Sequence, residues 1–222
     1  MLTLFSMNLF SKPHPHHPTT PVLPEHEEPE IASVPSTKHT ILEIARFSIV
    51  ALLIVIPIRL FIAQPFIVSG ASMADTFHTG EYLIVDQLSY HLHAPTRGDV
   101  VIFRYPLEPS KFFIKRVIGT PGDTIMIAGS VVTIKNEANP EGFVLDEPYI
   151  KSMRGNNTIE EVLGEREYFV MGDNRDESSD SRVWGVLQEE RIIGRAVIRL
   201  FPPSAADILP GSIDKDFTKQ NI

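Results

Sequence analysis

The chain of 222 residues contains no cysteine. This absence excludes disulfide bonds, thiol catalysis, cysteine-bound zinc and iron–sulfur clusters. Basic residues are also few, because 20 Lys and Arg stand against 28 Asp and Glu, giving a formal net charge of −8. That balance argues against nucleic-acid binding by a basic surface. With 43% hydrophobic and 22% charged residues, the composition is that of a globular chain whose length suits one domain with a tail.

Proline and histidine are concentrated near the N-terminus. Residues 11–40 hold seven of the 18 prolines, together with His14, His16, His17 and His26. Proline at this density blocks helices and strands, and the segment has too little apolar surface to offset chain entropy. We therefore expect residues 1–40 to form a disordered tail. Its histidines could bind a metal, but a solvated low-complexity tail is the simpler interpretation, and no metal site is predicted.

An apolar stretch follows at residues 41–68. Between Phe47 and Val68 the only strongly polar residues are Arg59 and Gln64. As a helix this length covers roughly 33 Å, which is enough for the hydrocarbon core of a bilayer. The alternative is a buried helix of a soluble core, but hydrophobicity on all faces favours the membrane. We predict a transmembrane anchor over residues 41–68.

Basic residues near this span predict its orientation. Lys38 and Arg46 lie on its N-terminal side, whereas residues 71–96 contain no Lys or Arg. The positive-inside rule then places the tail in the cytoplasm and the rest of the chain outside. We expect a single-pass protein of the plasma membrane with an extracytoplasmic C-terminal domain.

The remainder of the chain alternates short β-rich runs with turn residues. The expected strands are residues 81–87, 99–105, 112–118, 124–128, 131–135, 167–172 and 192–201. The expected turns or loops are residues 120–123, 139–142 and 172–182. No helix of ordinary length is expected here. The predicted fold is mainly β, a folded antiparallel sheet or barrel over residues 69–205, followed by a polar tail at 206–222.

Two residues could carry nucleophilic chemistry. Ser72 ends the run SGAS at 69–72, where small neighbours let a substrate backbone approach closely. Such a serine needs a base. Lys115 lies in an apolar strand with Phe113 and Val117 on its own face. Burial there would lower its pKa from roughly 10.4 towards neutrality. Taken separately, these residues are more often a plain turn and a snorkelling lysine.

Other sites have weaker support. His78, His91 and His93 stand in no motif of a Ser-His-Asp triad. The polar run at 172–185 has oxygen ligands that suit calcium, but it lacks the glutamate spacing of an EF-hand loop. A solvated loop is the default interpretation of that run, and a loop that orients a catalytic lysine is the alternative.

Together these regions resemble type I signal peptidases (leader peptidases), the membrane-anchored Ser/Lys proteases that remove signal peptides from exported proteins. The matching segments, in the family's order, are SGASMADT (69–76), RGDVVIFRYP (97–106), FIKRVIGTPGD (113–123), GDNRDESSDSRVWG (172–185) and IIGRAVIRLFP (192–202). The third and fourth are long and specific. The resemblance spans nearly all of residues 65–205.

The resemblance implies a catalytic dyad and a supporting group. Ser72 would be the nucleophile and Lys115 its general base, with the Ser72 backbone N–H as an oxyanion donor. Ser178 would hydrogen-bond and orient Lys115. Asp180 and Arg182 would form an ion pair that supports the loop. No metal or organic cofactor is implied.

The resemblance also implies a substrate channel, lined by Met73 and Gly70, and the sequence departs from the family nearby. Asp75 stands where the family usually has proline, and Gly70 stands where some members carry a serine that donates to the oxyanion. An anion close to the dyad would favour charged Lys115. We therefore expect Asp75→Pro to preserve or raise activity.

The implied function is cleavage of exported precursor proteins after small residues, of the Ala-x-Ala type. The implied partners are signal peptides and the lipid bilayer, without nucleic acid, and a monomer is expected. One alternative is a catalytically impaired homologue that acts as a membrane-anchored peptide-binding module. Asp75, in place of the family's proline, is the residue that suggests it. A self-cleaving repressor of the SOS type is opposed by the apolar span. A non-enzymatic β-domain anchored at the surface would leave Ser72 and Lys115 without a role.

Overall fold

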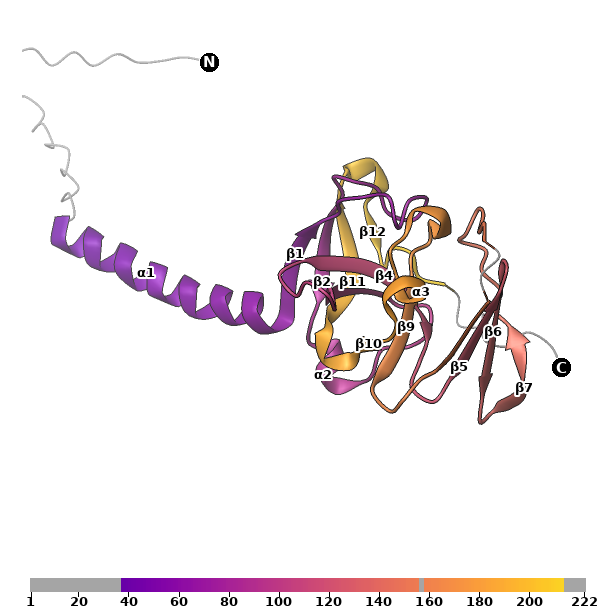
Figure 1. Cartoon of the computed structure of the whole chain (residues 1–222). Helices are drawn as coiled ribbons and strands as arrows, with labels where there is room; N and C mark the ends of the chain where they lie inside the picture. The colour runs from indigo at the N-terminus through magenta and orange to yellow at the C-terminus, as the bar shows by residue number, and fades with distance from the viewer. Residues whose placement is uncertain (1–36, 156–157, 214–222) are drawn as a thin grey trace, which may run out of the picture. The chain divides into compact units, whose positions relative to one another are not determined.

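The computed structural model describes residues 37–155 and 158–213 (Figure 1). The chain divides into two units, Met1–Ala45 and Arg46–Ile222. Within the first unit only the beginning of helix α1 (Thr37–Pro57) is described. The tail expected at residues 1–40 lies almost wholly outside the described residues, as does most of the polar tail expected at 206–222.

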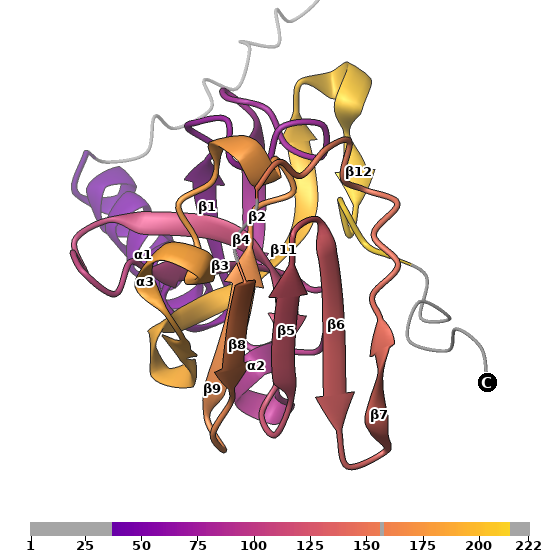
Figure 2. The ribbon, with the colours of Figure 1, turned by 45° about the vertical axis from the view of Figure 1, so that its right-hand side comes forward.

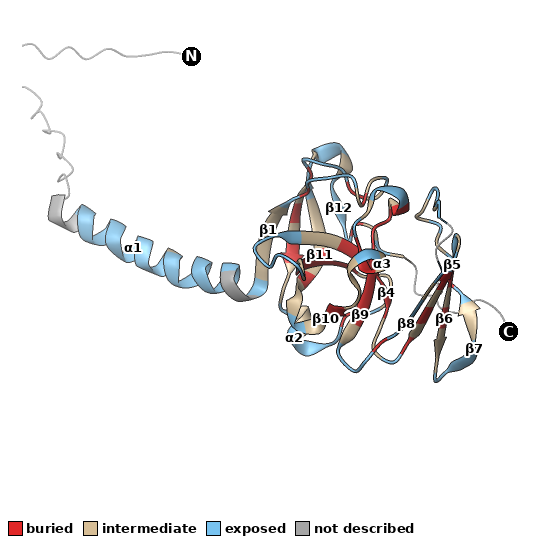
Figure 3. Ribbon diagram, in the orientation of Figure 1, coloured by how far each residue is buried: buried red, intermediate tan, exposed pale blue. Residues whose placement is uncertain are grey.

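Helix α1 presents apolar side chains to the surroundings along its length. Isoleucine, leucine, valine and phenylalanine side chains between Ile41 and Ile56 are exposed, as the pale blue ribbon in Figure 3 shows. Among the described residues, Thr40–Pro57 is the one helical stretch long and apolar enough to cross a membrane. Since exposed apolar surface is unfavourable in water, a lipid environment suits this helix.

The α-helix ends earlier than the sequence predicted. After Pro57 a π-helical turn, η1 (Ile58–Ile62), follows, and then strand β1 (Ala63–Ile67) in place of further helix up to residue 68. Pro65 explains this ending, because proline donates no N–H and drives the preceding residue towards extended backbone. The β-rich part therefore begins at Ala63 rather than at residue 69.

Two antiparallel sheets form the β-rich part (Figure 2). The first sheet has the order β1-β2-β11-β3-β4-β9-β10, with β12 paired to β11. Its further strands are β2 (Tyr82–Asp86), β3 (Val100–Arg104), β4 (Phe112–Gly119), β9 (Glu167–Met171), β10 (Leu187–Gln188), β11 (Ile192–Phe201) and β12 (Asp207–Ile208). The second sheet has the order β7-β6-β5-β8. Its strands are β5 (Thr124–Ala128), β6 (Val131–Asn136), β7 (Asn139–Val144) and β8 (Thr158–Val162). The predicted mainly β fold is confirmed.

Helices beyond α1 and η1 are short in the described part of the chain. They are α2 (Ser89–Leu92), η2 (Arg175–Glu177), α3 (Ser181–Trp184), η3 (Glu189–Arg191) and η4 (Pro203–Ala205). Of these, η2 and α3 lie in the polar run that follows β9. That run was expected to be a loop. Its two helical turns are compatible with this prediction, since each spans only three or four residues.

All seven predicted strands are present, with ends that agree within one residue. The turn predicted at residues 139–142 is contradicted, because that segment belongs to β7. The turn lies instead at residues 137–138. It is closed by the Asn139 backbone N–H, which donates to Asn136 Oδ1 at 2.9 Å. An asparagine side chain that accepts from backbone in this way promotes tight turns.

Strand β4 has apolar clusters on both of its faces. Phe113 and Val117 pack in the cluster that contains Phe103 and Val170. Ile118 faces a second cluster, which fills the space between β9 and the second sheet. Buried backbone is most continuous in β4 and β9 in Figure 3. Packing on both faces makes β4 a rigid support for any side chain that it carries.

Candidate active site

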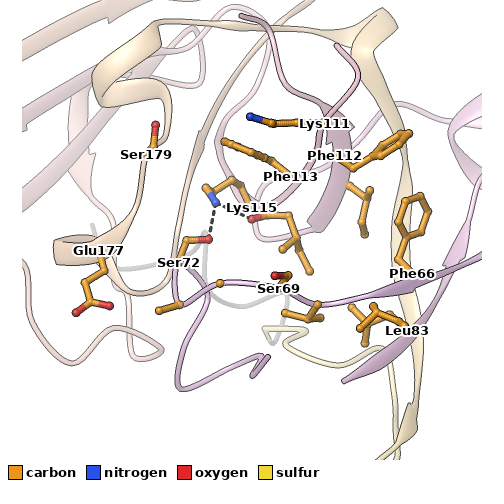
Figure 4. A pocket seen from close by; sticks show the side chains of 16 residues that line it. Phe66, Ser69, Ser72, Leu83, Lys111, Phe112, Phe113, Lys115, Glu177 and Ser179 are labelled. Atoms are coloured by element: carbon orange, nitrogen blue, oxygen red, sulfur yellow. Dashed lines mark hydrogen bonds between the residues drawn. The ribbon is translucent and has the colours of Figure 1, made fainter. Parts of the chain in front are cut away.

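Ser72 and Lys115 lie in direct contact. Ser72 follows β1 on the segment 68–76, and Lys115 projects from the middle of β4. The Lys115 Nζ lies 2.6 Å from Ser72 Oγ and 3.0 Å from the carbonyl oxygen of Ile114 (Figure 4). The two residues are 43 positions apart in the sequence, so the pairing of β1, β2, β11, β3 and β4 in one sheet is what brings them together.

Lys115 is nearly inaccessible to water, with 3% of its surface exposed. Burial lowers the pKa of Lys115 to about 8, against the opposing negative charges of Asp180 and Asp173. The Phe113 ring lies on the same side of β4, with its centre 5.2 Å from Nζ, as strand alternation predicted. An amine with this pKa is neutral in part of the molecules near neutral pH, and a neutral amine can accept a proton.

Gly172 lets the loop after β9 approach the nucleophile segment. A methyl group on Gly172 would collide with the carbonyl oxygen of Ser72 and with the Ser178 side chain. The need here is for space, since the backbone of Gly172 does not have a positive φ. Glycine is the residue that permits such close backbone approach. The sequence placed Gly172 in the polar run but gave no sign of this contact.

Residues 172–174 run beside residues 71–73 and bond to them in register. The Asp173 N–H points to Met73 Sδ at 3.4 Å. The Asn174 N–H donates to the Ser72 carbonyl oxygen at 3.1 Å. The Asn174 side-chain amide donates to the Ala71 carbonyl oxygen, also at 3.1 Å. Sequence reasoning missed Asn174, whose role depends on a contact between segments about 100 positions apart.

The predicted supporting group is assembled only in part. Arg182 pairs with Asp180 at 2.8 Å and also donates to the Arg175 carbonyl oxygen at 2.7 Å. Burial alone would raise the pKa of Asp180, but the Arg182 guanidinium and the Gly172 N–H hold it below its usual value. The Ser178 hydroxyl is buried and has no hydrogen-bond partner among the described residues. It therefore makes no bond to Lys115 in this arrangement.

Arg116 points to the other side of β4, because successive side chains of a strand alternate between its faces, and it makes a buried network there. Its guanidinium donates to both carboxylate oxygens of Asp173, at 2.8 and 2.6 Å, and to the Gly211 carbonyl oxygen at 2.6 Å. The Thr76 hydroxyl donates to the same carboxylate at 2.6 Å. The network therefore joins the strand of Lys115 to the segment of Ser72 without entering the dyad. In the sequence, Arg116 is only a basic residue beside Lys115, and no pattern there indicates these partners.

Asp75 points away from the dyad. Its carboxylate pairs with Lys151, and both side chains are accessible to solvent. The backbone of Asp75 has φ +79°, a left-handed conformation that aspartate tolerates better than most residues. Proline is fixed near −65° and cannot adopt it. This conformation opposes the expectation that Asp75→Pro preserves or raises activity, because the ring would force the turn to rearrange; the effect on activity stays a prediction.

A cavity of about 460 Å³ opens beside the dyad. Its lining is Phe66, Ile67, Val68, Ser69, Gly70, Ala71, Ser72, Leu83, Ile102, Lys111, Phe112, Phe113, Ile114, Lys115, Glu177 and Ser179. Most of these side chains are apolar, and Figure 4 shows Phe66 and Leu83 at the end away from Glu177 and Ser179.

The two predicted channel residues differ in position. Gly70 lines the cavity with φ +101°, a conformation that favours glycine. Met73 does not line it. Its side chain is 1% exposed and packs below the segment against Phe77 and Val100. The turn after Ser72, in which the Thr76 and Phe77 N–H groups donate to the Met73 carbonyl oxygen, directs this apolar side chain into the core. Among the described residues, no group of three or more His, Asp or Glu could hold a metal ion.

Comparison with known proteins gives one family. A family model described as "Signal peptidase, peptidase S26" matches residues 41–201. "Probable signal peptidase I-1" of Synechocystis sp. is 35% identical over 178 residues, covering 77% of this chain and 88% of the relative. "Signal peptidase I" of Leptolyngbya laminosa is 35% identical over 179 residues, covering 77% and 85%. A crystal structure of a signal peptidase I from Enterococcus faecalis is 27% identical, with TM-score 0.40, and covers 47% of this chain and 98% of its own.

Proposed function

The chain belongs to the signal peptidase family, peptidase S26, and on that premise we propose that it cleaves signal peptides from exported precursors with Ser72 as nucleophile and Lys115 as general base. The observation that carries this proposal is the 2.6 Å contact between Ser72 Oγ and the Nζ of Lys115, whose side chain is buried. Contact with a base is what a serine needs to become nucleophilic.

The proposed reaction is acyl transfer. Neutral Lys115 takes the proton of the Ser72 hydroxyl as Oγ attacks the carbonyl carbon of the scissile bond. The negative charge that develops on the carbonyl oxygen is stabilised by the Ser72 backbone N–H. When the intermediate collapses, the C–N bond breaks, the leaving amine takes the proton from Lys115, and an acyl-serine remains. Lys115 then accepts a proton from water as the water oxygen attacks the ester carbonyl carbon; the bond between that carbon and Oγ breaks, Lys115 returns the proton to Oγ, and the new carboxyl end of the peptide leaves.

The supporting residues act on Lys115 in this proposal. A methyl group on Gly172 would meet both the Ser178 side chain and the Ser72 carbonyl oxygen, so Ser178 lies near the nucleophile, and in this proposal its hydroxyl bonds to the amine when substrate binds. Catalytic hydrogen bonds are often incomplete without substrate. The ion pair of Asp180 with Arg182 holds the loop that carries Ser178.

The cavity supports specificity for small residues. An extended peptide can add to the free edge of β4 as a further strand, because pairing of β4 with β9 begins only at Arg116. Alternate side chains of such a peptide point the same way, so two of them face the apolar end of the cavity near Phe66 and Leu83. Shallow apolar pockets exclude large groups, which fits cleavage after Ala-x-Ala sequences.

The proposed domain organisation is a cytoplasmic tail over 1–40, an anchor formed by α1, an extracytoplasmic peptidase domain to residue 205 and a polar tail at 206–222. Lys38 and Arg46 support this orientation. Ser72 follows the anchor after about 15 residues, so the site would lie near the outer membrane surface, where signal peptides present their cleavage sites. Protease added outside intact cells should degrade the peptidase domain, and protection of that domain would overturn the orientation.

The second candidate is an impaired homologue that binds peptides without cutting them. Asp75 is the residue that favours it. The pairing of Asp75 with Lys151, and the position of Asp75 away from Lys115, weaken that case.

The experiment is processing of a precursor with an Ala-x-Ala site by the purified full chain in detergent. We expect Ser72→Ala and Lys115→Ala each to reduce kcat/KM at least about 1,000-fold, because each removes a member of the dyad. Matched controls are Ser130→Ala, in an exposed turn, and Lys135→Ala, in β6, which should remain within about twofold of wild type. A wild-type chain that binds the precursor without cutting it would support the impaired homologue. Full activity in either dyad variant would refute the proposed mechanism.

A further inference from the structure

The peptide unit between Ala71 and Ser72 has a special position in the site. It contains the Ala71 carbonyl group and the Ser72 N–H that donates to the oxyanion in the proposed function. A trans peptide is planar, and its C=O and N–H point in opposite directions. Whatever fixes the direction of the Ala71 carbonyl therefore also fixes the direction of the Ser72 N–H.

Two donors hold the Ala71 carbonyl oxygen. The Ala74 N–H lies 2.9 Å from it, but this donor belongs to the same turn and moves with it. The second donor is the Asn174 side-chain amide at 3.1 Å, from a residue 103 positions away. The Asn174 backbone N–H also donates to the Ser72 carbonyl oxygen. A single residue thus holds the carbonyl groups on both sides of the Ser72 nitrogen and α-carbon.

Asn174 is itself held in a rigid frame. The preceding residue, Asp173, is buried and bonded twice by Arg116. Before it, the Gly172 N–H donates to the Asp180 carboxylate at 3.0 Å. The following residue, Arg175, donates to the Gly172 carbonyl oxygen at 3.0 Å. The Asn174 amide is therefore held in place by contacts outside the turn that carries the nucleophile.

From this geometry we propose that Asn174 is a positioning residue that aims the Ser72 N–H at the oxyanion; the inference rests on the proposed function. The amide bond to the Ala71 carbonyl also polarises that peptide unit, which makes its N–H a stronger donor. Both effects act on the charge that develops in the transition state. They do not act on the proton affinity of Lys115, so Asn174 should affect kcat without moving the pH dependence.

The first test is Asn174→Ala in the full chain, assayed on the same precursor. Removal of the amide leaves Ala71 held only by its own turn, and we expect kcat to fall roughly 10-fold, less than the 10²–10³ that follows loss of an oxyanion donor itself. KM and the pH at half-maximal activity should stay unchanged. A peptide aldehyde, which forms a tetrahedral adduct with Ser72, should bind more weakly by about the same factor.

A second variant separates donation from shape. Asn174→Asp keeps the size of the side chain but directs a carboxylate oxygen at the Ala71 carbonyl oxygen, which repels it. We expect it to lose at least as much kcat as Asn174→Ala. The matched control is Asn139→Asp, the same change at the first residue of β7, which should stay within about twofold of wild type.

Several results would overturn the inference. These are Asn174→Ala activity equal to that of the Asn139→Asp control, full activity of Asn174→Asp, or a lower kcat with undiminished aldehyde binding. A loss accompanied by a shifted pH midpoint would assign Asn174 to Lys115 instead. Failure of the proposed function is distinct, because Ser72→Ala would then cleave as well as wild type whatever the Asn174 variants do.

Discussion

The two sheets differ in what they bury. The second sheet packs an all-apolar face, with Ile125, Ile127, Val132 and Ile134, against residues from β4 and β9. The first sheet and its loops bury charged and polar side chains as well. They are Glu81, Lys115, Arg116, Asp173, Arg175, Asp180 and Ser181. In the described strands β5–β8 no charged residue is buried; Asp123 lies just before β5.

This difference indicates that the second sheet mainly stabilises the fold, whereas the first sheet and its loops hold the polar groups that could take part in chemistry. Each fully buried aliphatic side chain of the second sheet contributes about 1.5 to 3 kcal/mol relative to exposure. A buried charge costs free energy unless it is paired and hydrogen-bonded. Around the first sheet Arg116, Arg175 and Asp180 have such partners. Lys115 contacts only a hydroxyl and a carbonyl oxygen. In the proposed function, the burial of this amine without a charged hydrogen-bond partner serves the reaction rather than the fold.

The largest expected effect compares two glycines near the first sheet: Gly172, beside Ser72, and Gly119, at the end of β4, where an added methyl group would meet the core of the second sheet. Gly172→Ala places a methyl group against Ser72 and Ser178, and displacement of reacting groups by about 1 Å can cost 10²-fold. We expect kcat/KM to fall at least about 100-fold while the chain remains folded. The measurement is precursor cleavage, with folding followed by circular dichroism.

Gly119→Ala is the matched control. Its methyl group would lie 2.6 Å from Ile125 and 2.7 Å from Leu163, inside the apolar core. Overpacking of this kind costs about 1 to 3 kcal/mol of unfolding free energy. Activity per folded molecule should stay within about twofold of wild type. Equal loss of activity in the two folded variants would contradict the view that packing against the second sheet affects stability alone.

A smaller effect concerns the stability cost of the catalytic amine. Because burial lowers the pKa of Lys115 to about 8 from an ordinary 10.5, the folded state holds its proton less tightly than the unfolded state. Below pH 8 the full cost is present, and it is lost as the pH rises towards 10.5. We expect Lys115→Met to raise the unfolding free energy by about 1 to 3 kcal/mol at pH 7.

Denaturant unfolding of the full chain in detergent would measure this gain. At pH 10 the gain should shrink to roughly a quarter of its value at pH 7, since most folded and part of the unfolded lysine is then neutral. Lys135→Met, the same change in β6, should alter stability by less than about 0.5 kcal/mol. Destabilisation by Lys115→Met at pH 7 would show that the amine contributes to the fold.

The sequence was sufficient for the strands with strong alternation and for selecting Ser72 and Lys115, which lie in contact in the structure. Lys115 stood in an apolar strand and Ser72 in a run of small residues, so local pattern and family motif agreed. Strand β8 was missed because its Glu160 and Glu161 weaken the pattern at an edge of the sheet. Strand β1 was hidden inside an apolar run, where helix and strand cannot be told apart without the pairing partner.

The contacts that complete the site were not predictable in the same way. Asn174 and Gly172 act through backbone atoms of a segment about 100 residues away, and no local pattern records such a contact. Met73 was assigned to the channel, but the turn after Ser72 directs it into the core. The backbone of Asp75 has a positive φ angle. The sequence shows that the usual proline is missing at this position, but it does not reveal that angle.

The smallest expected effect, and the most specific for the unpaired amine, is the pH dependence of cleavage. In the free enzyme Lys115 acts as a base only when neutral, and with a pKa of about 8 roughly a tenth is neutral at pH 7 and half at pH 8. We therefore expect kcat/KM to rise about fivefold between these values and to level off above about pH 9. Asp75→Asn removes the carboxylate that faces Lys151 and should leave the midpoint within about 0.2 pH units, because Asp75 is not among the charges that act on Lys115. A flat profile from pH 6 to 9 would mean that the proton of Ser72 goes to some other group.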